Sequence, residues 1–218
     1  MCGRYLVDDE VYADMWMLLN NGFGTHSSQL SVDERLTAAE NAPGVPSAAA
    51  QNPARGEVFP TNIAPVITHD GAVAVKWGFP HWKRSGVVIN ARAETALDKY
   101  MFRKPLQERR CVVPSSGFYE WSHGSGGKAK DKYLLREPGE RMLFMAGIVS
   151  TFTDSDGSRY DAFVILTTAA NTSVAPIHDR MPVILAPNEM GSWIMDAGFM
   201  QNVLHRTGPG LILKSAIE

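Results

Sequence analysis

Short apolar runs, bounded by polar or turn-forming residues, recur along most of the chain. Runs of this length that are rich in Val, Ile and Phe are typical of β-strands. The pattern predicts strands at 72–77, 86–89, 110–113, 142–150, 160–168 and 181–185.

Three segments have helical periodicity instead. The first is 9–21, and either Asp8 or Asp9 can cap its start. The second, 93–109, contains Pro105, where we expect an interruption because proline lacks the backbone N–H. The third is 187–205. The expected core residues are Val11, Met15, Leu18 and Leu19 in the first segment and Trp193, Ile194 and Phe199 in the third.

The segment 40–58 is rich in Ala, Pro and Gly and has no period, which predicts a surface loop within one fold. The glycines of Gly124–Gly127 predict an exposed turn. Many short strands with few helices favour one α+β domain over 1–218, built around a curved sheet.

The composition is that of an ordinary soluble protein, with 218 residues, 44% hydrophobic and 20% charged. No apolar run approaches the roughly 20 residues of a membrane span, and the acidic residues after Arg4 do not fit a signal peptide. We therefore expect a cytoplasmic protein with no membrane partner. Two cysteines, Cys2 and Cys111, exclude a disulfide framework, and a bridge between them is not expected in a reducing compartment.

The net charge of −2 conceals an uneven distribution. Residues 76–110 include nine basic and three acidic residues, whereas residues 1–75 include three basic and nine acidic ones. A basic block in a near-neutral protein fits a phosphate-binding surface. A solvated helix face explains the same block equally well.

The N-terminal sequence Met1-Cys2-Gly3-Arg4-Tyr5 has the most distinctive chemistry. A small second residue such as cysteine allows aminopeptidase to remove Met1. Cys2 would then present a thiol and an α-amine on adjacent carbons, with ordinary pKa values of about 8.5 and about 7.7–8.0. Such a 1,2-aminothiol condenses with an aldehyde, first to a Schiff base and then to a thiazolidine ring. A cysteine that stands at this position by chance is the alternative.

Polar residues occur where the predicted strands begin or end. Asn90 follows the run 86–89, and His178 precedes the run 181–185. Glu120 lies among aromatic residues in GFYEW at 117–121, surroundings that raise a carboxyl pKa and suit it to acid–base catalysis. Taken singly, a capping Asn90, a salt-bridged Glu120 and a structural His178 are the favoured interpretations.

The runs that contain these residues together resemble the SRAP family, the SOS response-associated peptidase-like or abasic-site processing proteins. They keep the order of the family and span nearly the whole chain. The matching stretches are MCGRY at 1–5, PTNIAP at 60–65, WGFPHW at 77–82, NARAET at 90–95, RRCVVPSSGFYEW at 109–121, FMAGIV at 144–149, ILTTAAN at 165–171 and IHDRMPVIL at 177–185. The resemblance implies a single SRAP-type domain with a mostly antiparallel, barrel-like sheet, flanking helices and an insertion at 40–58.

The resemblance also implies a function. Family members bind abasic sites in single-stranded DNA and link to them covalently, and we expect this chain to do so as a monomer without cofactor or metal, near the nucleoid in a bacterium. Cys2 matches the nucleophile, and Asn90, Glu120 and His178 match the other catalytic positions. The positions matched to DNA contacts are Arg4, Arg92, Trp82, Pro65 and either Thr167 or Thr168.

These matches suggest a role for each side chain. We hypothesise that His178 helps open the abasic sugar, that Glu120 moves protons during amine attack and ring closure, and that Asn90 orients the amine. Arg4 and Arg92 would hold phosphates. A base would stack on Trp82, and the arginines of 76–110 would supply salt-dependent affinity.

Several other functions use the same residues. A thiol peptidase that removes its own N-terminal residue and an abasic-site lyase both need Cys2. An N-terminal nucleophile amidotransferase also begins with Met-Cys-Gly, but the sequence contains no ammonia-using synthetase domain. A noncatalytic single-strand-binding module would not need the thiol. A zinc site from Cys2, Cys111 and two histidines has no characteristic ligand spacing.

Overall fold

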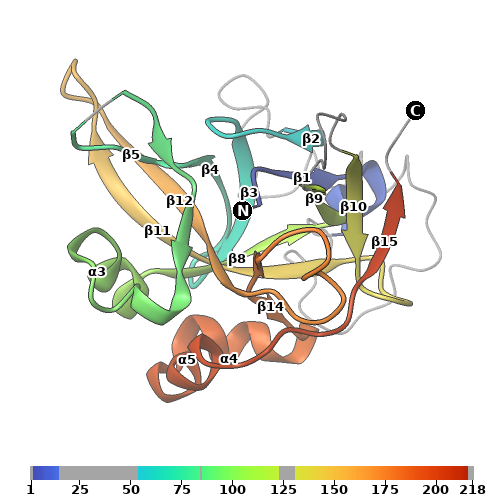
Figure 1. Cartoon of the computed structure of the whole chain (residues 1–218). Coiled ribbons are helices and arrows are strands. Elements are labelled where there is room, and N and C mark those ends of the chain that lie inside the picture. Colours follow the sequence, from blue (N-terminus) through green and yellow to red (C-terminus); the bar gives the residue numbers. More distant parts are fainter. Residues whose placement is uncertain (1, 15–53, 84, 123–130, 216–218) are drawn as a thin grey trace.

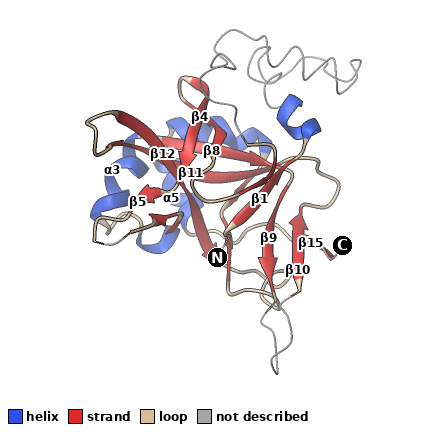
Figure 2. Cartoon of the chain, turned by 90° about the horizontal axis from the view of Figure 1, so that it is seen from above, coloured by secondary structure: helices blue, strands red, loops and turns tan. Residues whose placement is uncertain are grey.

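The computed structural model describes residues 2–14, 54–83, 85–122 and 131–215. This part of the chain consists of two main β-sheets and a few helices, which confirms the α+β prediction (Figures 1 and 2). The predictions for Met15, Leu18 and Leu19, for residues 40–53 and for Gly124–Gly127 lie outside the described residues.

Five strands close into a barrel. They are β3 (Ile63–Thr68), β4 (Gly71–Trp77), β8 (Arg110–Ser115), β11 (Leu143–Thr153) and β12 (Arg159–Ala169). Around the barrel, β3 pairs with β4, β4 with β12, β12 with β11, β11 with β8, and β8 with β3. Only the β4–β12 pairing among these five is parallel, so the expected barrel-like, mostly antiparallel core is confirmed.

Alternate residues of the barrel strands belong to two hydrophobic cores. In β12, Phe163 and Ile165 contribute to the core shared with the second sheet, and Val164 and Leu166 contribute to the core under the helices. Both faces of such a strand are buried, and both are therefore apolar. This explains why 160–168 is a nearly continuous apolar run rather than an alternating one.

The second sheet has the strand order β15-β10-β9-β1-β2 and is antiparallel throughout. Its strands are β1 (Arg4–Val7), β2 (Gly56–Val58), β9 (Gly117–Trp121), β10 (Lys132–Arg136) and β15 (Ile212–Ser215). Tyr5 of β1 lies opposite Phe118 of β9, and both side chains are fully buried in the shared core. Because β1 is paired on both edges, the chain immediately before it is held in place, and that chain contains Cys2.

Helices cover the outside of the barrel (Figure 1). They are α3 (Tyr100–Glu108), α4 (Met190–Met195) and α5 (Ala197–Leu204), with two short 3₁₀ helices, η1 (Ala93–Thr95) and η2 (Pro187–Glu189). Trp193 is fully buried, and its indole N–H donates to the Cys111 carbonyl at 2.9 Å. Ile194 and Phe199 are only partly buried against this core. In the described residues, no helix has the length and apolar content needed to cross a membrane.

The predicted interruption at Pro105 is wrong. The helix α3 runs through Pro105 and ends at Glu108, and the break lies at 96–99, between η1 and α3. Pro105 removes one N–H donor near the end of a nine-residue helix, and its ring is buried beside Leu106. Burial of this face outweighs the lost hydrogen bond.

Several strand boundaries also differ from the predictions. The run 181–185 is divided into β13 (Arg180–Pro182) and β14 (Ile184–Leu185), because Val183 between them donates to Leu166 of β12 and accepts from Ala146 of β11. The run 86–89 shortens to β6 (Val87–Val88), which pairs with β5 (Phe79–Pro80). The end of the 40–58 loop forms β2.

The predicted N-terminal helix begins where expected. Residues 9–14 are helical, and the Asp8 carboxylate accepts from the Val11 N–H at 2.9 Å, which is the geometry of an N-cap. Val11 is buried in the shared core, as its predicted position on the apolar face requires.

Candidate active site and nucleic-acid interface

Cys2 lies at the entrance to β1 with its side chain fully buried. Its thiol donates to the Arg4 carbonyl, with Sγ and O 3.6 Å apart. Its own carbonyl accepts from Nδ2 of Asn90 at 2.9 Å. Cys2 is therefore held by its own strand and by a residue distant in sequence.

Asn90 begins β7 (Asn90–Arg92), which pairs in parallel with β12 and places Asn90 opposite Ile165. Pairing with the barrel thus carries the amide to Cys2. Within the described part of the chain, the other amide atom, Oδ1, is buried and accepts no hydrogen bond. A buried acceptor of this kind is costly to leave unsatisfied, and it lies on the side chain that already touches Cys2.

Glu120 lies on β9, the strand that pairs with β1 beyond Cys2. It shares a face of the sheet with Phe118, since successive strand residues alternate, and only 2% of its surface is exposed. Burial raises the pKa of the Glu120 carboxyl to about 7, and the Asp179 carboxylate adds to this. Burial, and then the charge of Glu120, also raise the pKa of the Cys2 thiol. The sequence prediction of a carboxyl with a raised pKa is confirmed.

His178 precedes β13 and is mostly buried. Its Nδ1 accepts from the Arg180 backbone N–H at 2.9 Å. The same Nδ1 lies 3.0 Å from Oδ1 of Asp179, the residue whose charge acts on Glu120. His178 is thereby oriented by its own loop.

Sequence reasoning missed Arg180. Its guanidinium makes a bidentate ion pair with Glu94, at 2.7 and 2.9 Å, and donates to the Thr167 carbonyl at 2.6 Å. The pKa of Glu94 is lowered by the hydrogen bonds from Arg180. Arg180 therefore joins the His178 loop to β12 and to the 3₁₀ helix that follows Arg92. The motif IHDRMP contains Arg180, but no local pattern indicates a partner 86 residues away.

The proposed DNA-contact residues lie in different environments. Arg4 and Arg92 reach the surface, and Trp82 has 76% of its surface exposed. Thr167 and Thr168 are buried in β12, and Thr167 is paired with Arg92. The prediction that a base packs beside Pro65 conflicts with the structure, because Pro65 is buried in the middle of β3, opposite Ala74.

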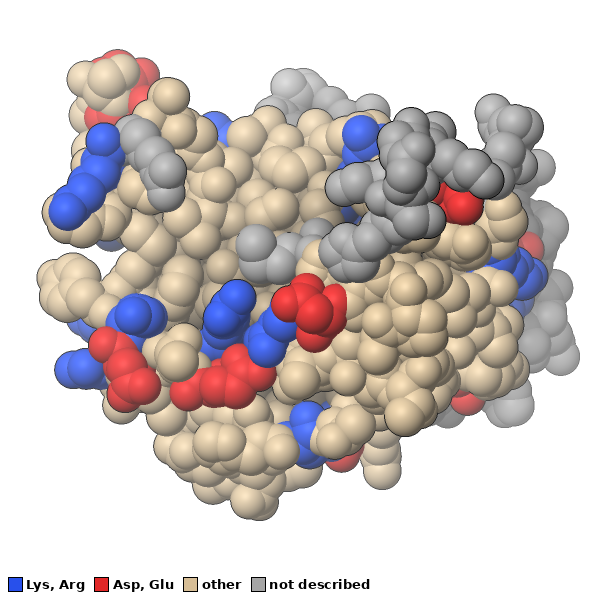
Figure 3. Space-filling model, in the orientation of Figure 1, with Lys and Arg blue, Asp and Glu red and all other residues tan. Residues whose placement is uncertain are grey.

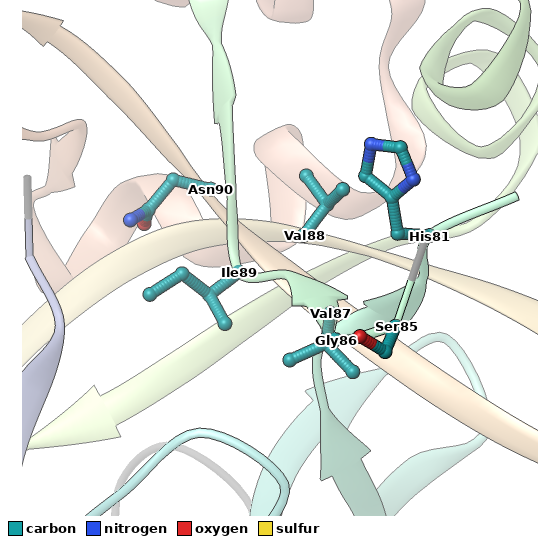
Figure 4. A pocket seen from close by; sticks show the side chains of 7 residues that line it. All are labelled: His81, Ser85, Gly86, Val87, Val88, Ile89 and Asn90. Carbon is teal, nitrogen blue, oxygen red and sulfur yellow. The ribbon is translucent and has the colours of Figure 1, made fainter. Parts of the chain in front are cut away.

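A cavity of about 500 Å³ adjoins this site. It is lined by His81, Ser85, Gly86, Val87, Val88, Ile89 and Asn90. Figure 4 shows Asn90 at one end, with its amide directed away from the His81 and Ser85 end. The β5–β6 hairpin, which includes Trp82 at its turn, forms one wall. The residue that holds Cys2 thus also lines a hollow beside the most exposed tryptophan of the described chain.

The basic block at 76–110 is only partly available to a ligand. Arg110 is buried, and its guanidinium donates to the carbonyls of Leu106, Gln107, Trp193 and Ile194, so its predicted role in DNA affinity is wrong. Arg109 is paired with Asp161 at 2.7 Å. Figure 3 shows basic side chains interspersed with acidic ones on the side where α3 lies. The described residues contain no group of three or more His, Cys, Asp or Glu that could hold a metal.

Comparisons with known proteins identify relatives of this chain. The chain is 33% identical over 168 residues to the abasic site processing protein YoqW of Bacillus subtilis, covering 68% of this chain and 75% of YoqW. It is 36% identical over 121 residues to the abasic site processing protein YedK of Escherichia coli, covering 55% of this chain and 53% of YedK.

Solved structures share the fold. A protein from Bacteroides thetaiotaomicron superposes with a TM-score of 0.73 at 24% identity, over 98% of this chain and 91% of that one. A protein from Bordetella bronchiseptica gives a TM-score of 0.72 at 19% identity over the full length of both. The family model described as SOS response associated peptidase (SRAP) matches residues 1–208. The chain therefore belongs to the SRAP family.

Proposed function

We propose that this protein captures abasic sites in single-stranded DNA as a covalent adduct of Cys2, after removal of Met1. The relatives named abasic site processing proteins support a DNA lesion as the substrate. The observation that carries the proposal is the contact of Asn90 with Cys2, which leaves a buried amide oxygen beside the residue that would bear the free α-amine. An amine N–H is a donor that this oxygen lacks.

The proposed reaction joins the two nucleophiles of Cys2 to one carbon. An abasic deoxyribose opens to an aldehyde, and the amine of Cys2 adds to C1′ to give a carbinolamine. Loss of one water gives a Schiff base. The sulfur then adds to the same carbon, its proton passes to the nitrogen, and a thiazolidine ring is formed. The net change is the loss of one water, and no redox partner is needed.

Glu120 is suited to the proton transfers of this sequence. Addition of the amine requires a proton acceptor, and departure of water requires a proton donor. A carboxyl with a pKa of about 7 exists in both forms near neutral pH and can do either. The charge of Glu120 raises the pKa of the Cys2 thiol, which supports a place for Glu120 near both nucleophiles.

His178, Arg4 and Arg92 would prepare the sugar. The imidazole of His178 can donate a proton to the ring oxygen as the sugar opens. Arg4 and Arg92 leave their strands near Cys2 and Asn90 and can hold the flanking phosphates. Exposed Trp82, next in sequence to the cavity-lining His81, offers a stacking surface.

Closure of the ring also bears on lyase activity. A Schiff base at C1′ permits β-elimination of the 3′ phosphate and strand cleavage, whereas a thiazolidine resists it. Cys2→Ser keeps the amine but closes the ring poorly, so we expect an adduct that is less durable on heating and more strand cleavage. Heat resistance equal to that of the wild type would contradict the thiazolidine.

The proposal is tested by mixing the protein, after N-terminal sequencing, with single-stranded DNA that contains one abasic site. We expect a heat-stable shifted band on a denaturing gel with the wild type and with Cys111→Ala, and none with Cys2→Ala. Cys111→Ala is the matched control, because it removes the other buried thiol. A band that persists with Cys2→Ala, or no band with wild-type protein that begins at Cys2, would contradict the proposal.

The peptidase alternative has its own test. If Glu120 also assists removal of Met1, Glu120→Ala protein retains Met1 when wild-type protein loses it. Mass spectrometry of both proteins, expressed in the same host, separates self-processing from processing by the aminopeptidase of the host.

A further inference from the structure

A charged cluster lies on one face of the second sheet, β15-β10-β9-β1-β2, and Glu120 lies on the other face. Strand register places Glu57 beside Leu6 and Arg4 opposite Tyr119, while Lys132 lies opposite Trp121. Side chains alternate between the two faces of each strand. Arg4, Glu57 and Lys132, which we call the outer cluster, therefore share one face, and Glu120 is on the other.

Within the outer cluster, the carboxylate of Glu57 bridges the two cations. Its Oε2 lies 3.4 Å from Nη1 of Arg4, and its Oε1 contacts Nζ of Lys132. The three side chains are 26%, 39% and 24% exposed for Glu57, Arg4 and Lys132 respectively. A carboxylate that bridges two half-buried cations occupies a place that suits the oxygens of a phosphate.

Aromatic rings hold both cations independently of Glu57. The guanidinium carbon of Arg4 lies 4.6 Å from the Phe59 ring centre and 5.0 Å from that of Trp121. Nζ of Lys132 lies 4.1 Å from the Tyr119 ring centre. These are cation–π distances. The two positive groups should therefore remain close together when the carboxylate leaves, ready for another anion.

The outer cluster is also close to the proposed nucleophile. Arg4 follows Cys2 by two residues, a separation of about 7 Å along an extended chain. The flanking phosphates of a strand whose abasic sugar is bound to Cys2 can therefore reach this region. Glu57 carries the same charge as a phosphate and contacts the same cations, so the two cannot both be fully paired.

On this geometry we propose that Glu57 is a competing anion that occupies a phosphate subsite between Arg4 and Lys132 in the free protein, and that Lys132 is a second phosphate ligand. The inference rests on the proposed function, in that the ligand is single-stranded DNA. The free energy needed to displace Glu57 weakens the binding of single-stranded DNA by a constant factor. A duplex or a protein surface that cannot displace Glu57 binds less tightly still.

The test measures noncovalent binding with an undamaged, fluorescent single-stranded oligonucleotide, by anisotropy over a range of salt concentrations. We expect Glu57→Gln to bind roughly three- to ten-fold more tightly than the wild type at low salt. Lys132→Gln should bind more weakly, and its salt slope should fall by about 0.7, the value for one single-strand phosphate contact.

The matched control is Glu189→Gln. Glu189 is also a partly exposed carboxylate bonded to an arginine, Arg206, and its loss changes the net charge equally. We expect its DNA affinity to equal that of the wild type. If Glu57→Gln binds no more tightly than Glu189→Gln while its thermal unfolding is unchanged, Glu57 does not compete and the inference is wrong.

Crosslinking of the same variants separates this inference from the proposed function. Tighter binding by Glu57→Gln without crosslinking by any variant would support the phosphate subsite and contradict covalent capture. Normal crosslinking with no gain for Glu57→Gln would contradict the subsite alone. Failure of every variant to bind single-stranded DNA would contradict both.

Discussion

The two cysteines of this chain are buried to the same degree, but they differ in their neighbouring residues and in whether they can carry an α-amine. Burial raises the pKa of both thiols. Cys111 lies inside the barrel on β8, opposite Gly147, and its backbone carbonyl supports Trp193. Cys2 lies beside Asn90 and Glu120 and, once Met1 is removed, carries an α-amine. The comparison indicates that the amine and its neighbours, rather than a reactive thiolate, define the site.

The largest expected effect on the crosslinking rate comes from replacing Glu120, the carboxyl near Cys2 that we propose transfers protons. Glu120→Gln keeps the shape of the side chain and abolishes titration. We expect the single-turnover crosslinking rate to fall by roughly 10²- to 10⁴-fold, the usual contribution of general acid–base catalysis. Quenched time points on denaturing gels measure it, and a rate within two-fold of the wild type would remove Glu120 from the mechanism.

The same substitution should stabilise the fold in alkaline solution. The pKa of Glu120 is raised from 4.5 to about 7 by folding, so the folded protein holds this proton more tightly than the unfolded chain. The resulting destabilisation is absent below about pH 4.5, grows as the pH rises and is complete above about pH 7. At pH 8, Glu120→Gln should gain about 3 kcal/mol in the free energy of unfolding relative to the wild type.

Urea unfolding of both proteins between pH 4.5 and pH 8 measures this difference. The difference should widen from about pH 4.5 to about pH 7 and then stay constant. A gap that is constant over this range would mean that Glu120 is not protonated on folding, and it would weaken the assignment of Glu120 as both donor and acceptor.

A substitution beside Cys111 should lower the stability of the fold without changing the rate of crosslinking. A Cβ added at Gly147 would lie 2.9 Å from Sγ of Cys111 and 3.1 Å from the Val164 carbonyl oxygen. Gly147→Ala should therefore cost about 1–3 kcal/mol of stability through overpacking. The folded fraction should crosslink at the wild-type rate, and a large loss of rate in fully folded protein would show that the barrel interior is coupled to Cys2.

The smallest effect concerns the amide that holds Cys2. Asn90→Ala removes the hydrogen bond to the Cys2 carbonyl, a contribution of about 1 kcal/mol. We expect crosslinking to slow by roughly five-fold with Glu120 unchanged, because about 1 kcal/mol corresponds to that factor in rate. Asn90→Asp, which keeps an acceptor oxygen, should retain more activity than Asn90→Ala, and the reverse order would contradict the proposed role of Oδ1.

The sequence predicted what depends on local pattern. The apolar runs at 142–150 and 160–168 became β11 and β12. The place of Asn90 after a predicted strand, and of Glu120 among aromatic residues, made both of them candidate site residues. The barrel itself depends on pairings between distant strands, such as β4 with β12, which periodicity does not reveal.

The errors have the same origin. Arg110 was assigned to the DNA surface, but the carbonyls of Trp193 and Ile194, more than 80 residues away, bind it inside the protein. Pro65 was assigned to a base contact, but it is buried in the middle of β3, a strand of the barrel. In both cases a tertiary contact, rather than the residue type, decides exposure.

The central claim, that Cys2 closes a thiazolidine while Cys111 takes no part, is tested most directly by counting free thiols. The purified DNA adduct and the free protein are unfolded, alkylated with iodoacetamide and weighed intact by mass spectrometry. We predict that the free protein carries two labels and the adduct one, at Cys111, with Met1 absent and one water lost. Two labels on the adduct would show that the sulfur of Cys2 remains free and would contradict the account.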